Sequence, residues 1–67
     1  MKNDFARNIK DMRLQKGLLQ KDMAEKLNTT QRKISYWESG TVEPDLDTLI
    51  DIAEFFCVTI DELIKKE

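Results

Sequence analysis

Residues 20–40, QKDMAEKLNTTQRKISYWESG, constrain the fold of this chain more than any other segment. Met23 and Leu27 give the first part of the segment one apolar face, and Ile34 and Trp37 give the second part another. Apolar residues at these intervals are typical of amphipathic helices. The segment therefore predicts two short helices that pack against a common core and are joined by a tight turn.

The turn and the second of these helices carry clear local signals. Asn28 tolerates a positive φ, which suits the turn. Thr30 is a suitable N-cap for a helix over residues 31–39, and Gly40 can close that helix. The positions of this helix that the core does not occupy are polar or aromatic: Gln31, Arg32, Lys33, Ser35 and Tyr36.

Those side chains have the chemistry of DNA readers. Gln and Arg form two-pronged hydrogen bonds with adenine and guanine edges in the major groove. A short helix that presents them, braced by a second helix, is the arrangement of a helix-turn-helix. The sequence thus predicts a DNA-reading element over about residues 20–39.

The rest of the chain predicts three further helices and no strand. A helix over residues 4–15 carries an apolar stripe and has Asn3 as its N-cap; the stripe comprises Phe5, Ile9 and Met12. A helix over residues 46–56 follows Asp45, and a short helix over residues 60–66 follows a capping box of Thr59 and Glu62; both Asp and Thr are favourable N-caps. These elements predict a single all-α domain of five helices over residues 1–67.

The net charge of −2 hides a strong asymmetry. Nine Lys and Arg against five Asp and Glu leave residues 1–40 with a net charge of +4. Two Lys against eight Asp and Glu leave residues 41–67 with −6. A basic half that holds the reading helix can present a positive face to DNA despite an acidic half behind it, although ordinary solvated helix charge is an equally good explanation of this pattern alone.

Composition argues against an enzyme and against a membrane protein. The chain has no His, so it can form neither a Ser-His-Asp triad nor a histidine metal site, and no cofactor or metal is expected. Cys57 is the single cysteine, and we interpret it as a structural residue beside the core rather than a nucleophile. No apolar run approaches the length of a membrane span, and the N-terminus lacks an apolar signal segment. We therefore expect a cytoplasmic protein.

An ordered set of residues resembles the Cro and phage-repressor type of helix-turn-helix domain, the Xre family, over roughly residues 9–64. The matching positions are Arg13, Lys16-Gly17, Leu18, Gln20, Ala24, Ile34, Trp37-Glu38, Gly40, Pro44 and Asp47-Thr48-Leu49. The resemblance implies a five-helix, lambda-repressor-like fold. It also implies a buried structural ion pair between Arg13 and Glu38.

The resemblance assigns roles to residues of the two helices. Gln20 would grip a phosphate at the start of its helix, and Gln31 and Arg32 would read base edges. Tyr36 matches another base-contacting position, and Lys33 one that meets phosphate or a base. Thr30 and Ser35 are secondary candidates, and for each of these polar residues plain surface exposure is the alternative.

Three departures from the family pattern carry expectations. Leu19 stands where a Ser or Thr usually caps the first helix of the pair, which removes a cap worth about 1 kcal/mol and exposes an apolar side chain. Cys57 stands where Gly usually follows the fourth helix, so a positive φ there would be strained. The loop over residues 41–45, often basic in the family, here holds two acids, which predicts weaker phosphate contacts.

The resemblance implies a bacterial or phage transcriptional regulator, a repressor, that binds a roughly palindromic operator in double-stranded DNA as a homodimer. Phe55, Ile60 and Ile64 are candidates for an apolar dimer patch, with completion of the small core as the alternative and, for Ile60, the favoured one. A protein-interaction module, such as an antitoxin or anti-repressor, is the alternative function, and a regulatory protein partner is compatible with either.

Overall fold

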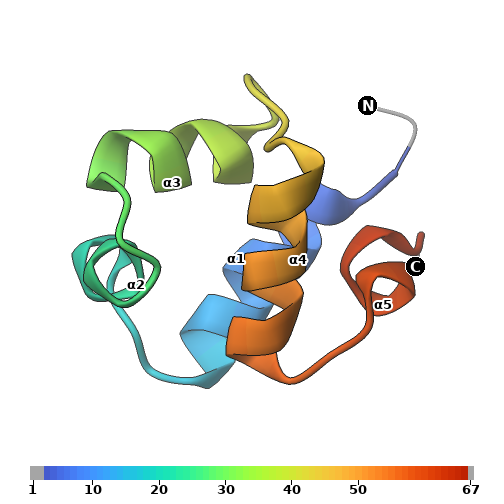
Figure 1. The fold of residues 1–67 in the computed structure, drawn as a ribbon, viewed down its shortest axis with the longest axis horizontal. Coiled ribbons are helices and arrows are strands. Elements are labelled where there is room, and N and C mark those ends of the chain that lie inside the picture. The colour runs from blue at the N-terminus through green and yellow to red at the C-terminus, as the bar shows by residue number, and fades with distance from the viewer. Residues whose placement is uncertain (1–2, 67) are drawn as a thin grey trace.

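Five α-helices and no strand make up residues 3–66, the part of the chain that this computed structural model describes. In chain order the helices are α1 (Phe5–Gln15), α2 (Gln20–Lys26), α3 (Gln31–Ser39), α4 (Leu46–Phe56) and α5 (Ile60–Ile64). In Figure 1, α3 lies across the top of the molecule, and α2 and α5 lie on opposite sides of α4. Helix α3 packs on α1 and α2, and α5 packs on α1 and α4. The all-α, five-helix prediction is confirmed.

The core forms from one face of each helix. Ile9, Met23, Ile34, Ile52 and Leu63 come from five different helices, and their side chains are fully buried. Five further apolar residues complete the buried cluster: Phe5, Ala24, Trp37, Ala53 and Phe56. Because each short helix contributes at most three side chains to this buried cluster, its stability depends on packing against the other helices.

The bounds of α3 and α4 agree with the sequence prediction, and those of the other helices differ by one or two residues. At the start of α1 the N-cap is Asp4, so the predicted Asn3 cap was wrong by one position. The Asn3 side chain still satisfies an orphan amide, because its Oδ1 accepts from the Phe5 N–H at 3.0 Å. Helix α5 ends at Ile64, so Lys65 lies in extended backbone beyond the helix instead of in its last turn.

Side-chain caps start three of the helices as predicted. The Thr30 hydroxyl accepts from the Lys33 N–H at 3.2 Å, and Asp45 Oδ1 accepts from the Thr48 N–H at 2.9 Å. At α5, Thr59 and Glu62 form the reciprocal capping box. Each such cap satisfies a backbone amide that the helix itself cannot, which contributes about 1 kcal/mol.

Helix α2 starts without a side-chain cap, as its Leu19 implies. The Leu19 side chain is 60% exposed. Asp22 reaches back and its Oδ2 accepts from the Leu19 N–H at 3.1 Å. That bond fulfils half of a capping box, and the carboxylate also lies near the positive end of the helix dipole.

Two residues other than glycine adopt left-handed backbone. Asn28, in the turn before α3, has φ +56°, as predicted. Cys57, which ends α4, has φ +57° and ψ +42°. A β-carbon in this region crowds the following carbonyl, so Cys57 carries the strain that its replacement of glycine implied. The Cys57 side chain is exposed, so the expectation that it sits beside the core was wrong.

Candidate nucleic-acid interface

Helix α3 is anchored by two side chains on its inner face. Ile34 is completely buried and Trp37 is 4% exposed. Ala24 of α2 is also buried, and α2 and α3 are in contact. These contacts fix which side of α3 faces solvent.

The outer face of α3 consists of the five residues that the core does not use. All five are exposed: Gln31, Arg32, Lys33, Ser35 and Tyr36. Of these five side chains, only that of Gln31 forms a hydrogen bond within the described residues. Thr30 is exposed as well, but its hydroxyl oxygen already serves as the cap of α3.

Beneath this face, Arg13 and Glu38 form a two-pronged ion pair. Arg13 Nε donates to Glu38 Oε2 at 2.6 Å, and Arg13 Nη2 donates to Glu38 Oε1 at 2.9 Å. The two side chains are only 8% and 4% exposed. Arg13 Nη1 also donates to the Leu18 carbonyl at 2.8 Å. The hydrogen bonds from Arg13 to Glu38 raise the pKa of Arg13 against the opposing effect of burial.

A chain of side-chain contacts leads from this pair to the outer face of α3. Gln20 is half-buried at the start of α2, and its Nε2 donates to Glu38 Oε1 at 3.1 Å. Gln20 Oε1 in turn accepts from Gln31 Nε2 at 3.5 Å, a long contact. The structure thus brings Gln20 and Gln31 together, so Gln31 keeps its carbonyl and one amide hydrogen for another acceptor or donor.

The three dimer candidates lie in different places. Phe55 is half-buried and lines a groove between α2 and α4. Ile64 lines a separate cavity of about 180 Å³ beside Pro44. Ile60 and Ile64 are half-buried and pack on the core cluster.

Sequence reasoning missed two features. Asn8 is 4% exposed, and its Nδ2 donates to the carbonyls of Leu63 and Lys65 at 2.9 Å each. Its position beside Ile9 on the inner stripe of α1 was the available signal. Leu46 and Ile50, one helical turn apart on α4, are 67% and 38% exposed, which is unusual for apolar residues of a small domain.

Acidic side chains dominate the region that follows α3. No Lys or Arg occurs between Lys33 and Lys65. Hydrogen bonds from Thr48 lower the pKa of Asp45, and attraction from Lys33 contributes in the same direction. The positive charge available to an anionic ligand is therefore concentrated on the side of the chain that contains α1, α2 and α3.

Residues 3–66 contain neither a membrane-spanning helix nor a metal-binding cluster. No helix among them has the length and apolar character needed to cross a membrane. No group of three or more His, Cys, Asp or Glu side chains in residues 3–66 is placed to hold a metal ion.

Comparison with known proteins identifies the family. Residues 9–63 match the model of a family described as helix-turn-helix. The HTH-type transcriptional activator BcrR of Enterococcus faecalis is 41% identical over 64 residues, which are 96% of this chain and 31% of that protein. The uncharacterized HTH-type transcriptional regulator YqaE of Bacillus subtilis is 43% identical over 63 residues, 94% of this chain and 54% of that protein.

A phage-derived relative and a solved structure agree with these matches. The cryptic phage CTXphi transcriptional repressor RstR of Vibrio cholerae is 32% identical over 60 residues, 90% of this chain and 54% of that protein. A crystal structure of a transcriptional regulator from Listeria innocua superposes with a TM-score of 0.87 at 36% identity, covering 96% of this chain and 60% of that one. The chain thus spans between 31% and 54% of the length of the curated relatives described. It belongs to the helix-turn-helix family of the Cro and phage-repressor type.

Proposed function

We propose that this chain binds a specific sequence in double-stranded DNA with α3 in the major groove and acts as a transcriptional repressor in the prokaryotic cytoplasm. The observation that carries the proposal is the outer face of α3, where five polar or aromatic side chains are exposed together. A surface helix without a ligand has no need to place Gln, Arg and Lys in succession at its N-terminus, where base edges are read in this type of domain.

The chemistry of the side chains on this face suggests which of them contact bases and which contact phosphates. Arg32 suits the O6 and N7 acceptors of guanine, and Gln31 suits the N6 and N7 groups of adenine. The long contact of Gln31 Nε2 with Gln20 Oε1 at 3.5 Å supports this role, because it is compatible with an amide that faces the groove. Lys33, at the edge of the same face, suits a phosphate oxygen, which would position the helix without reading sequence.

A homodimer and a roughly palindromic operator are part of the proposal. One short helix reads only a few base pairs, so proteins of this type bind two half-sites about 34 Å apart. The described part of the chain measures 27 × 23 × 21 Å, so two copies side by side can place their α3 helices at about that spacing. A domain of this size also gains stability from a partner subunit.

The charge distribution supports weak binding with a shallow dependence on salt concentration. The loop between α3 and α4 presents Glu43 and Asp45 where basic residues would add phosphate contacts. Each phosphate contact that is lost reduces the slope of binding affinity against salt concentration and the affinity itself. Sequence-specific contacts through Gln31 and Arg32 would then carry a larger share of the binding free energy.

The proposal is tested by titrating the protein into genomic DNA fragments, including the region upstream of its own gene, with excess random competitor at two salt concentrations. We expect one or a few fragments to stay bound in the presence of competitor. Binding that competitor or salt abolishes for every fragment would contradict the proposal. The acidic half of the chain would then favour the second candidate function, a module such as an antitoxin or anti-repressor that acts through a basic protein partner.

A further inference from the structure

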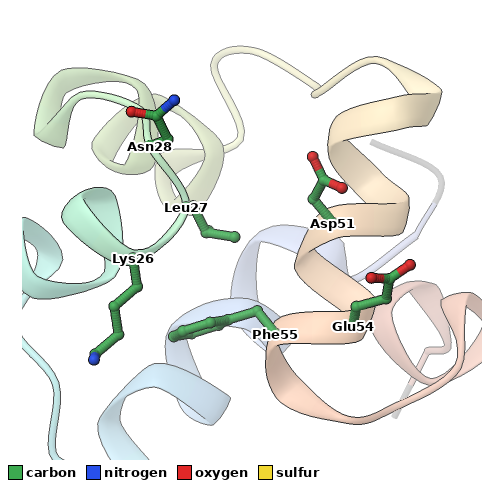
Figure 2. A pocket seen from close by; sticks show the side chains of 6 residues that line it. All are labelled: Lys26, Leu27, Asn28, Asp51, Glu54 and Phe55. Atoms are coloured by element: carbon green, nitrogen blue, oxygen red, sulfur yellow. The ribbon is translucent and has the colours of Figure 1, made fainter.

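A shallow groove runs between α2 and α4, below the turn that leads into α3 (Figure 2). Its volume is about 410 Å³, and its lining residues are Lys26, Leu27, Asn28, Asp51, Glu54 and Phe55. A neighbouring hollow of about 350 Å³ shares Lys26 and Phe55 with it and adds Lys16 and Leu18. We call the two together the Phe55 groove.

The floor of the Phe55 groove is apolar. The Phe55 ring points from α4 toward α2 in Figure 2, and it packs against Phe56 edge to face with ring centroids 4.9 Å apart. Leu18 and Leu27 are half-buried beside it. An aromatic ring and two aliphatic side chains that are only partly covered are the composition found at the centre of protein–protein contacts.

The two walls of the groove carry opposite charges. Lys16 and Lys26 are exposed on the side of α1 and α2, and Asp51 and Glu54 are exposed on the side of α4. The ion pairs found within residues 3–66 are Arg7–Asp4 and Arg13–Glu38, both outside the groove. The four charges of the walls are therefore available to groups on another molecule.

We propose that the Phe55 groove is the surface through which two copies of this chain associate, about a twofold axis that runs along the groove. In a twofold contact the same patch is used by both copies, and a residue that contacts another is contacted by it in return. With the axis along the groove, the cationic wall of each copy lies over the anionic wall of the other, and the two Phe55 rings meet near the axis. Charge complementarity of this kind fixes the register of an interface.

This contact specifies the homodimer that the proposed function requires, and in that respect it rests on the proposed function. The groove includes none of the five residues on the outer face of α3, so its occupation leaves that face free. Leu46 and Ile50 form the competing apolar surface. The charged residues nearest to them along α4 are all acidic, so a second copy docked there would bring like charges together.

The test is sedimentation equilibrium of the 67-residue chain without DNA, over a range of concentrations and at low salt. Lys26→Glu and Glu54→Lys, each alone, should weaken association by roughly tenfold or more, because twofold symmetry introduces each repulsion twice. The double variant should recover wild-type association. A mixture of the two single variants should form one-to-one dimers, because each copy then supplies the charge that the other lacks.

Two control variants test whether a loss of association is specific to the groove. Lys10→Glu and Glu25→Lys make the same charge changes at exposed positions of α1 and α2 that line neither hollow, and they should leave association unchanged. All of these side chains are exposed, so circular dichroism should show each variant folded. Retained binding of each variant to a single operator half-site would show that the outer face of α3 is intact.

Three results would overturn the inference: a wild-type chain that stays monomeric at all concentrations, single charge reversals that leave dimers unaffected, or a double variant that does not recover. Dimers that survive the charge reversals but dissociate on Leu46→Ser would place the contact on the competing surface. Failure of the wild-type protein to prefer any DNA sequence would instead contradict the proposed function, and the sedimentation results would still decide whether the groove is the contact.

Discussion

Gln20, the first residue of α2, donates from Nε2 to Glu38 Oε1 at 3.1 Å near the end of α3. The same carboxylate accepts two hydrogen bonds from Arg13 of α1. A single buried side chain therefore connects three helices. Gln20 Oε1 also lies 3.5 Å from Gln31 Nε2, so a series of side-chain contacts links Glu38 to the outer face of α3.

Removal of this carboxylate should destabilise the fold strongly. Glu38→Ala leaves the Arg13 guanidinium buried without its counter-ion, which should lower the free energy of unfolding by about 3–5 kcal/mol. Urea denaturation followed by circular dichroism measures this. The double variant Arg13→Met, Glu38→Leu removes both charges and should recover most of the loss. A loss below about 1 kcal/mol for Glu38→Ala would mean that the guanidinium finds water instead.

Replacement of Cys57 by glycine should stabilise the protein. Cys57 ends α4 with φ +57°, a conformation that costs a residue with a β-carbon about 1–2 kcal/mol. Glycine removes that strain but gains entropy in the unfolded chain, so we expect a net gain of about 0.5–1 kcal/mol in the free energy of unfolding. Cys57→Ala is the control, because it removes the thiol and keeps the β-carbon. A glycine variant that is less stable than the alanine variant by about 0.5–1 kcal/mol would show that the backbone there is unstrained.

The cap of α4 should make stability depend on pH in the acid range. Hydrogen bonds from Thr48 lower the pKa of Asp45 in the folded state below its ordinary value near 4. As pH falls, the unfolded chain binds the proton first, so the contribution of this group is complete above about pH 4 and is lost as pH falls through the lower folded pKa.

Asp45→Asn provides the comparison for this prediction. Asparagine keeps a side-chain oxygen for the Thr48 amide but cannot titrate. As pH falls below about 4, the wild type should therefore lose unfolding free energy relative to the variant. A difference that stays constant over this range would assign the acid dependence to other carboxylates.

The sequence predicted those parts of the structure that depend on local chemistry. The apolar spacing within residues 20–39 and the caps Thr30 and Asp45 depend on neighbours a few positions away, and they were predicted correctly. The end of α5 was not, because the carbonyls of Leu63 and Lys65 there accept hydrogen bonds from Asn8, which lies 55 and 57 residues away in the sequence. The Phe55 groove likewise forms only when α2 and α4 pack into the fold. A local sequence pattern therefore cannot predict it.

Arg32 and Lys33, which are adjacent on α3, should contribute differently to DNA binding: Arg32 to sequence preference and Lys33 to general affinity. Arg32→Ala should cost about 1–3 kcal/mol on the operator and little on random DNA, because it removes a base-edge contact. Lys33→Ala should weaken binding to both by a similar factor and reduce the salt slope by about 0.9, because it removes a phosphate contact. Fluorescence anisotropy on operator and random duplexes at several salt concentrations measures both effects.

Arg7→Ala is the control for these two variants, since Arg7 is an exposed cation of α1 that pairs with Asp4. It changes the net charge by the same amount and should leave both the sequence preference and the salt slope nearly unchanged. Arg32 and Lys33 have the same charge and are adjacent in sequence. A difference between the effects of their substitutions on DNA binding must therefore come from the different directions in which the two side chains point. Equal losses for Arg32→Ala on operator and random DNA would show that its guanidinium meets backbone, and the base-reading role would pass to Gln31 and Tyr36.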